Sequence, residues 1–333
     1  MTTIREVAKR AGVAPITVSR VLNNSGYFSQ ESKDRVEAAA AELHYVPNLL
    51  ARSLRSNRTQ TLGLVLSDIT NPFWTTVARG VEDAASEQGF TVILCNTDEK
   101  ERKQAEYLAV LLRKRVDGIL LVPARSTPEA VKMIQKQGVQ VVVVDRRVPG
   151  AEVDVVRGSS TQGAAELVKY LLALGHRQVA ILSGPERVST AQERVNGCQQ
   201  ALAAAQLPAA AMTVLYGEFT VESGDTMARQ AVALTPRPTA LFAANNFIAI
   251  GALKALRELG VRVPEDISVV GFDDLPASLV VDPFLTVAAQ PAYQMGQCAT
   301  ELLLQRIIAP EATPYREVVL PTQLIVRQSC RAV

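Results

Sequence analysis

The segment TIREVAKRAGVAPITVSRVLNN, residues 3–24, decides how the first part of this chain folds. Thr3 and Glu6 match the capping box, in which a hydroxyl and a carboxylate three residues apart bind the free amides at a helix start. Gly12 ends this helix, and Pro15 suits the first turn of a second one, where its missing N–H costs nothing. The periodicity places the apolar side of the first helix at Ile4, Val7, Ala8 and Ala11.

A third helix is expected over about residues 31–43. Two short helices joined by a tight glycine turn and followed by a third form the helix-turn-helix pattern. The inward side chains are expected at Val18, Val21 and Leu22 in the second helix and at Val36, Ala39, Ala40 and Leu43 in the third.

Residues 47–60 connect this segment to the rest of the chain. Pro47 ends the third helix, because the residue before a proline avoids the helical region. Residues 48–55 have the length of two helical turns, which is too short for a helix that is stable alone in water. Residues 56–60 have the composition of a linker.

From Thr61 onward, apolar strand-like runs alternate with segments of helical length. This alternation predicts parallel sheets covered by helices on both faces, arranged as two similar α/β lobes. The tail, with short strands at 286–289 and 317–320 and a helix at 291–307, is expected to cross back between the lobes. The other strands are expected at 61–66, 91–95, 118–122, 141–145, 178–183, 211–216, 239–244 and 267–272, and the other helices at 72–88, 100–114, 128–137, 161–174, 190–205, 222–233 and 245–259.

The charge of the 333-residue chain is small overall, at +2, but it is unevenly placed. Residues 1–60 carry nine Lys/Arg and five Asp/Glu, a net of +4, whereas the remainder carries 26 and 28, a net of −2. A basic excess on a small helical segment makes nucleic acid the first partner to consider. The 48% hydrophobic and 20% charged residues are typical of a globular protein and exclude a disordered or fibrous chain.

The opening residues MTTIREVAKR lack the apolar core of a signal peptide. The apolar runs are far shorter than the ~20 residues of a membrane-spanning helix. The four cysteines are well separated and form no CxxC motif, as expected of reduced thiols: Cys95, Cys198, Cys298 and Cys330. We therefore expect a cytoplasmic protein with no membrane partner.

Motifs of common enzyme classes are absent from the sequence. It contains no GxGxxG, GxxxxGK[ST], HExxH or GxSxG. It has two histidines, His44 at the end of a predicted helix and His176 in a turn, and we expect both to have structural and not catalytic roles. Asp273 and Asp274 are adjacent and point in different directions, which makes them a poor acid/base pair. We expect no enzyme activity, no catalytic residue, no metal and no cofactor.

Binding residues gather after the predicted strands instead. In parallel α/β lobes, ligands bind beyond the carboxyl ends of the strands. Aromatic rings, amides, arginines and aspartates at these ends suit a small polyhydroxylated molecule, which stacks on the rings and hydrogen-bonds to fixed donors and acceptors. The residues found there are Asp68, Asn71, Phe73, Trp74, Asp145, Arg146, Arg147, Thr190, Arg194, Phe219, Asn245, Asn246, Asp273 and Asp274.

Three segments together, TIREVAKRAGVAPITVSRVLNN, ELHYVPNLLARSLRSNRT and TLGLVLSDITNPFW, resemble the lactose-repressor (LacI/GalR) family of bacterial transcription regulators. The resemblance covers essentially the whole chain. It implies a helix-turn-helix headpiece at 1–46, a hinge helix and linker at 47–60, and a two-lobed core at 61–333, similar to periplasmic sugar-binding proteins. It also implies a homodimer on a near-palindromic double-stranded operator. The lobes are expected at about 61–158 with 290–318 and at about 159–289 with 319–333.

The same resemblance implies which residues meet DNA. Arg20 matches a position that forks onto guanine and Ile16 one that touches a thymine methyl, whereas Pro15, at a third such position, offers no side-chain hydrogen bond. Phosphate contacts, which set register, are expected from Thr17, Asn23, Tyr45 and Asn48, and hinge contacts from Ala51, Leu54 and Arg55.

In the core, several residues match positions that contact sugar in the family, so the resemblance implies a carbohydrate-like effector. Asn246 departs from the family, in which an aspartate is usual, so we expect a more cationic pocket that suits a sugar acid or phosphorylated sugar, with a neutral sugar also open. A purine- or other metabolite-responsive corepressed regulator is an alternative, and a solute-binding protein without a DNA role is another. The predicted effector residues are Asn71, Phe73, Trp74, Asp145, Arg146, Thr190, Arg194, Phe219, Asn246 and Asp273.

The predicted role of Leu54 can be tested directly. Its counterpart in the family wedges into the minor groove and kinks the operator, which costs a few kcal/mol of base unstacking. We expect Leu54→Ala to weaken operator binding far more than binding to random DNA, as measured by gel shift. Equal loss on both DNAs would contradict the wedge role.

Overall fold

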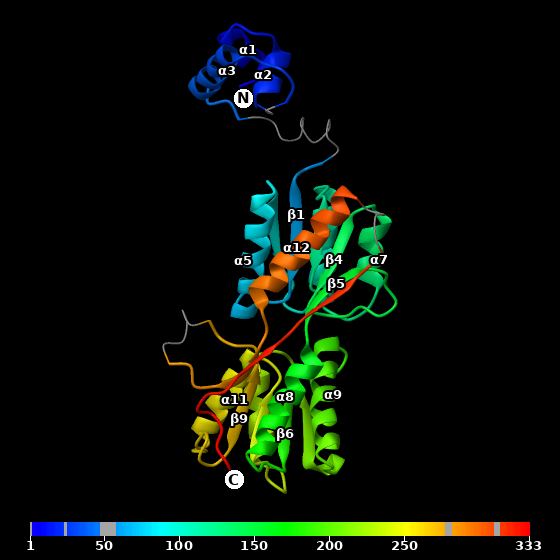
Figure 1. Cartoon of the computed structure of the whole chain (residues 1–333), viewed down its shortest axis with the longest axis vertical. Helices are drawn as coiled ribbons and strands as arrows, with labels where there is room; N and C mark the ends of the chain where they lie inside the picture. The colour runs from blue at the N-terminus through cyan, green and yellow to red at the C-terminus, as the bar shows by residue number, and fades with distance from the viewer. Residues whose placement is uncertain (1, 23–24, 47–57, 277–281, 310–313) are drawn as a thin grey trace. The chain divides into compact units, whose positions relative to one another are not determined.

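The computed structural model describes residues 2–22, 25–46, 58–276, 282–309 and 314–333. The chain divides into two compact units, residues 1–59 and 60–333 (Figure 1). The first unit, the headpiece, contains α1 (Ile4–Ala11), α2 (Pro15–Leu22) and α3 (Gln30–Glu42), which confirms the three predicted helices. Its small core consists of Val7, Ala8, Ala11, Val18, Val21, Val36 and Ala39.

Both ends of α1 follow from the sequence. The Thr3 hydroxyl accepts from the Glu6 amide at 3.4 Å, and the Thr3 amide donates to the Glu6 carboxylate at 2.7 Å, so the predicted capping box is present. Gly12 takes a left-handed conformation with φ of 65°, which glycine adopts without strain. Arg35 of α3 donates to the carbonyl oxygens of Ala11 and Gly12, each at 2.9 Å, and thereby ties α3 to the end of α1.

The second unit contains two six-stranded sheets (Figure 1). The first sheet has the order β11-β5-β4-β3-β1-β2, and its neighbouring strands pair in parallel. Its strands are β1 (Thr61–Leu66), β2 (Thr91–Asn96), β3 (Gly118–Leu121), β4 (Gln140–Val144), β5 (Asp154–Gly158) and β11 (Glu317–Leu320). With the helices α5 (Pro72–Glu87), α6 (Glu101–Arg113), α7 (Glu129–Lys136) and α12 (Ala292–Ile308), it forms what we call the first lobe.

The second sheet has the order β12-β10-β9-β8-β6-β7 and is parallel except for the antiparallel pair β10–β12. Its strands are β6 (Val179–Ser183), β7 (Met212–Tyr216), β8 (Ala240–Ala243), β9 (Ser268–Phe272), β10 (Thr286–Ala289) and β12 (Gln323–Ile325). The second lobe combines this sheet with α8 (Ser160–Ala173), α9 (Ser189–Ala204), α10 (Val221–Val232), α11 (Asn246–Glu258) and the short 3-10 helix η1 (Ala209–Ala211). The chain passes between the lobes after β5, after β10 and after β11.

Two strands, β5 and β12, are absent from the sequence prediction. The apolar run of β5 is interrupted by Asp154 and Arg157, which made the segment look like a connection. The structure buries both charges because each has a partner: Asp154 pairs with Arg306 of α12 at 2.6 Å, and Arg157 pairs with Glu317 of β11.

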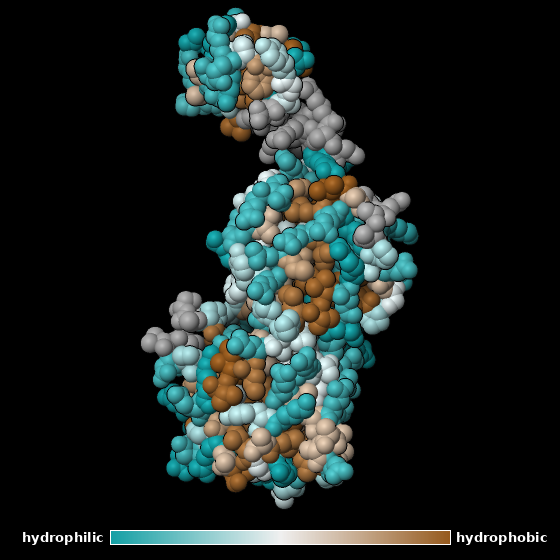
Figure 2. Space-filling view, viewed as in Figure 1, coloured by the Kyte–Doolittle hydropathy of each residue, from teal (hydrophilic) through white to brown (hydrophobic). Residues whose placement is uncertain are grey.

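The surface of the described residues is mixed in polarity. Figure 2 shows apolar side chains gathered in patches on both lobes among polar ones. Exposed apolar residues include Ile308 at the end of α12 and Val319 on the edge strand β11. Such patches provide area for contact with another chain. None of the described helices combines the length and apolar character of a membrane span.

Close helix packing in the first lobe depends on a pair of glycines. Gly80 of α5 and Gly296 of α12 lie where the two helices cross, and a Cβ on Gly296 would collide with the carbonyl oxygen of Val77. We expect Gly296→Ala to lower the free energy of unfolding by about 1–3 kcal/mol, because the helices must separate. Urea unfolding followed by circular dichroism measures this change. The exposed control Gln294→Ala should stay within about 0.5 kcal/mol, and an equal effect of both would contradict the crossing argument.

Candidate functional site

The headpiece presents part of α2 to solvent. Val18 and Val21 are buried in the core of the headpiece, whereas the Ile16 side chain is 55% exposed. Pro15 and Arg20 are exposed and Thr17 is half-buried. The predicted DNA-reading side chains of α2 are therefore accessible from solvent. An exposed helix face of this kind can enter a major groove.

Two other observations complete the headpiece. Tyr45, predicted to contact phosphate, is half-buried and packs against the headpiece core. Tyr27, in the loop between α2 and α3, is 88% exposed. Predicted contacts at five positions lie outside the described residues: Asn23, Asn48, Ala51, Leu54 and Arg55.

A cavity of about 410 Å³ lies between the carboxyl ends of the two sheets. The structure brings nine of the ten predicted effector residues to its wall. Its lining consists of Ser67, Asp68, Asn71, Phe73, Trp74, Asp98, Glu99, Lys100, Asp145, Arg146, Thr190, Arg194, Glu218, Phe219, Thr220, Asn245 and Asp273. The strand-end rule therefore located the cavity from the sequence.

Asn246 is the exception. It does not line the cavity but pairs with Asn71 of the first lobe through two amide hydrogen bonds of 2.9 Å, one in each direction. Its neighbour Asn245 lines the cavity and caps α11 by accepting from the Ile248 amide at 2.8 Å. Asn246 thus joins the two lobes and lies outside the cavity lining that the other nine predicted effector residues share.

Arg146, directly after β4, is held by a carboxylate that the sequence prediction missed. Its guanidinium binds Glu99 through two bonds of 2.5 and 2.7 Å and donates to the Pro123 carbonyl at 2.6 Å. Glu99 follows β2, so the strand-end rule applies to it as it does to Arg146. The Arg146 Nε is buried without a hydrogen-bond partner among the described residues. A buried donor without a partner is rare in folded proteins, and Arg146 is one of the residues that line the cavity.

Arg194 of α9 is fixed in a different way. Its guanidinium lies over the Phe272 ring, 3.9 Å from the ring centroid, and donates to the Ala244 carbonyl at 2.6 Å. Its Nε is also buried without a hydrogen-bond partner in the described chain. The cavity therefore has one immobilised arginine from each lobe.

Asp145 and Asp273 directly follow β4 and β9, and both have left-handed backbone conformations, with φ of 70° and 67°. Such a conformation is uncommon for residues other than glycine and is concentrated at functional sites. Burial raises the pKa of Asp145, and the nearby Arg194 opposes this effect. Burial raises the pKa of Asp273 to about 6, although Gln290 donates to its Oδ1 at 2.7 Å. Asp145 Oδ1 has no hydrogen-bond partner among the described residues.

Aromatic rings supply the apolar part of the cavity. Phe73 and Trp74 at the start of α5 pack edge to face, with ring centroids 4.8 Å apart. Phe219 lies against Gly184, where any Cβ would collide with the ring. These rings offer the flat apolar surfaces on which a sugar or a base can stack.

The charge of the lining contradicts the expected cationic pocket. Three cations, Lys100, Arg146 and Arg194, face six carboxylates. The carboxylates are Asp68, Asp98, Glu99, Asp145, Glu218 and Asp273. A phosphate or carboxylate ligand would meet repulsion in this lining, because like charges at close range destabilise a complex. The lining instead suits hydroxyl groups, which donate to carboxylates and accept from arginines.

Neither histidine belongs to this cavity. His176 is buried in the second lobe and hydrogen-bonds through its ring nitrogens to Thr239 at 2.8 Å and to Ser268 at 3.0 Å, which confirms the structural interpretation. Among the described residues, no group of three or more His, Cys, Asp or Glu side chains is arranged to hold a metal ion.

Comparison with known proteins adds the following. Residues 3–48 match the model for bacterial regulatory proteins of the lacI family, and residues 59–328 match that for periplasmic binding proteins and the sugar binding domain of the LacI family. The chain is 37% identical over 308 residues to the HTH-type transcriptional repressor PurR of Vibrio atlanticus, which covers 92% of each chain. It is 36% identical over 331 residues to the ribose operon repressor of Halalkalibacterium halodurans, covering 99% of this chain and 98% of the relative. The structure of the Lac repressor dimer bound to operator and the anti-inducer ONPF superimposes with a TM-score of 0.86 at 28% identity, over 99% of both chains.

The raised pKa of Asp273 generates a prediction about stability. Ionising this carboxyl in the folded protein requires a pH above about 6, against an ordinary value of 3.8. The cost of its buried charge is therefore complete above pH 6 and vanishes towards pH 4. We expect Asp273→Asn to be more stable than the wild type at pH 8, by on the order of 2–3 kcal/mol, with the gap narrowing as the pH falls to about 4.

Urea unfolding of the two proteins at pH 4.5, 6 and 8 measures this gap. The exposed control Asp282→Asn should show no such pH-dependent gain. A difference between wild type and Asp273→Asn that is flat across this range would contradict the argument.

Proposed function

Because the chain belongs to the LacI family of bacterial DNA-binding repressors, we propose that a small neutral sugar of the pentose class, bound in the cavity, controls its affinity for an operator. The observation that carries this proposal is the lining, in which six carboxylates and two immobilised arginines surround a space flanked by aromatic rings. Hydroxyl groups satisfy such donors and acceptors without adding charge. The similarity to a ribose operon repressor supports the same class of ligand.

The domain organisation of this proposal assigns each role to a segment. Residues 1–46 form the DNA-binding headpiece, 47–60 the hinge helix and linker, and 61–333 the core. We place the lobe boundaries at about 61–158 with 290–318 and at about 159–289 with 319–333. A headpiece with one recognition helix binds one half-site of an operator. A symmetric homodimer carries two such helices and therefore fits two half-sites arranged as a near-palindrome. Such a regulator acts in the cytoplasm, where its DNA is.

Control requires that the effector bind the two states of the core with different affinities. Residues from both lobes line the cavity, so a ligand that contacts Arg146 and Arg194 together favours the arrangement in which the lobes are close. A few kcal/mol of differential affinity suffices to change operator occupancy. We propose that the sugar acts as an inducer and releases the operator.

A purine-responsive corepressor mechanism is the second candidate. The rings of Phe73, Trp74 and Phe219 favour it, because a planar base can stack between aromatic side chains. The excess of carboxylates favours the sugar, since a polyhydroxylated ligand provides more donors for them. A solute-binding protein without a DNA role does not explain the headpiece.

Footprinting on the DNA that flanks the gene of this protein tests the proposal. We expect one protected near-palindromic site, which 10 mM D-ribose releases, and neither ribose 5-phosphate nor hypoxanthine should mimic this release. Arg20→Ala should lose about 1–3 kcal/mol at the protected site while keeping its affinity for random DNA. Stronger protection with hypoxanthine would favour the purine mechanism, and protection that D-ribose leaves unchanged would contradict the sugar assignment.

A further inference from the structure

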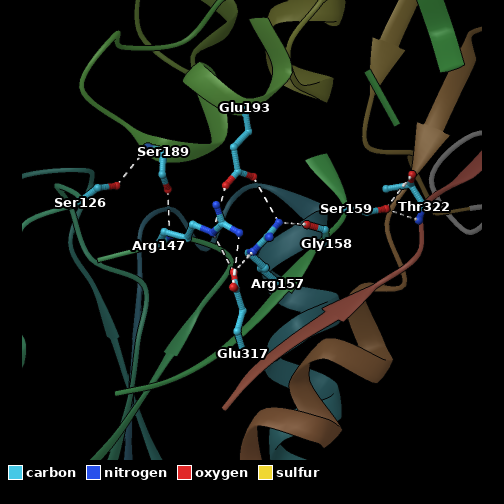
Figure 3. A network of polar contacts seen from close by, with 9 residues as sticks. All are labelled: Ser126, Arg147, Arg157, Gly158, Ser159, Ser189, Glu193, Glu317 and Thr322. Atoms are coloured by element: carbon cyan, nitrogen blue, oxygen red, sulfur yellow. Dashed lines mark hydrogen bonds and ion pairs between the residues drawn. The ribbon is translucent and has the colours of Figure 1, made fainter. Parts of the chain in front are cut away.

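A network of four alternating charges crosses between the lobes (Figure 3). Arg147, after β4, and Arg157, on β5, both bind Glu317 of β11, with the Arg147 Nε 2.7 Å from its Oε1. Glu193 of α9 approaches from the second lobe, and its Oε2 lies 3.4 Å from the Arg157 Nη1. Its Oε1 lies 3.6 Å from the Arg147 Nε. The four side chains are neutral as a set.

Glu193 is the residue of this network that belongs to the second lobe and contacts the first. In the described chain, its carboxylate pairs with Arg147 and Arg157, both in the first lobe. The side chains of Glu193 and Arg157 are 12% and 10% exposed, so this contact is shielded from water. A shielded ion pair is attractive only while its partners stay close, because separation leaves a partly buried charge unpaired.

A second contact crosses at the same place. The α9 helix starts after Val188, whose side chain does not cap it. The amide of Ser189, its first residue, donates instead to the Ser126 hydroxyl of the first lobe at 3.0 Å. The Ser189 hydroxyl accepts from the Arg147 amide at 2.9 Å. The first lobe therefore caps a helix of the second, and separating the lobes would expose that helix end.

These contacts are adjacent in sequence to the cavity wall. Glu193 directly precedes Arg194, and Arg147 directly follows Arg146. Each lobe thus contributes to the network a residue next to its own cavity-lining arginine, yet neither Glu193 nor Arg147 lines the cavity.

We propose that Glu193 is a positioning residue that, through Arg147 and Arg157, holds α9 against the end of β4 and so sets the affinity of the cavity for its effector without touching it. The affinity part of this inference rests on the proposed sugar function. The lobe-holding part concerns the protein without ligand and is independent of it.

Hydrogen exchange of the full-length, unliganded protein tests the lobe-holding part. We expect Glu193→Gln to speed exchange about tenfold in peptides covering the first turn of α9, because the Ser189 amide loses its partner more often. The free energy of unfolding should fall by no more than about 1.4 kcal/mol, the equivalent of that tenfold change. Glu265→Gln, a matched change at an exposed glutamate of the second lobe, should leave exchange unchanged. Wild-type exchange rates in Glu193→Gln would overturn the proposal.

Calorimetric titration with D-ribose tests the affinity part. Glu193→Gln should bind about tenfold more weakly than both the wild type and Glu265→Gln. Arg147→Gln should behave like Glu193→Gln, and the double variant should bind no more weakly than the weaker single variant, because the residues act as one unit. Additive losses would overturn the network.

The two proposals fail in different ways. A wild type that does not bind D-ribose overturns the sugar assignment, and faster exchange in Glu193→Gln then still supports the role of Glu193. If the wild type and Glu193→Gln bind D-ribose equally tightly, the positioning role is overturned and the sugar assignment stands.

Discussion

Pairing of buried charge is the constraint on which the core depends. Arg146 and Arg194 lie below the surface between two lobes, and a buried ion costs several kcal/mol unless its surroundings compensate for it. Glu99 and a backbone carbonyl compensate Arg146, whereas a carbonyl and the face of Phe272 compensate Arg194. Each guanidinium is thereby immobilised, with one buried Nε that has no hydrogen-bond partner in the described chain. The same contacts that make the charges tolerable make the cavity ready for a ligand.

This constraint also determines how the lobes meet. The contacts that we describe between them are directional and few: the amides of Asn71 and Asn246, the pairs of Glu193, and the cap of Ser189. An interface of this kind has a small free energy relative to separated lobes, since polar groups regain water when they part. A ligand of ordinary affinity is then enough to shift the population between the two arrangements.

The sequence was sufficient for features that depend on neighbours along the chain. The capping box of α1, the ends of the parallel strands and most of the cavity wall follow from local patterns. It was insufficient where a residue depends on a partner far away. β5 is apolar enough for a strand only because Arg306 and Glu317 neutralise its charges, and Asn246 avoids the cavity because Asn71 faces it. The negative net charge of the cavity lining was missed for another reason. Glu99 and Glu218 follow β2 and β7, where the strand-end rule applies, but the prediction took only Phe219 from these two strand ends.

The two recognition surfaces differ in how freely their specificity can change. Ile16 and Arg20 are exposed on α2 and contribute little to the headpiece core, so substitutions there alter DNA reading with little effect on folding. In the core, a change at Arg146 or Arg194 leaves Glu99 or Asp273 without an opposing charge in a buried place. A new effector therefore requires compensating substitutions in both lobes, whereas a new operator requires few. The charge pairing that prepares the cavity for one ligand also restricts its exchange for another.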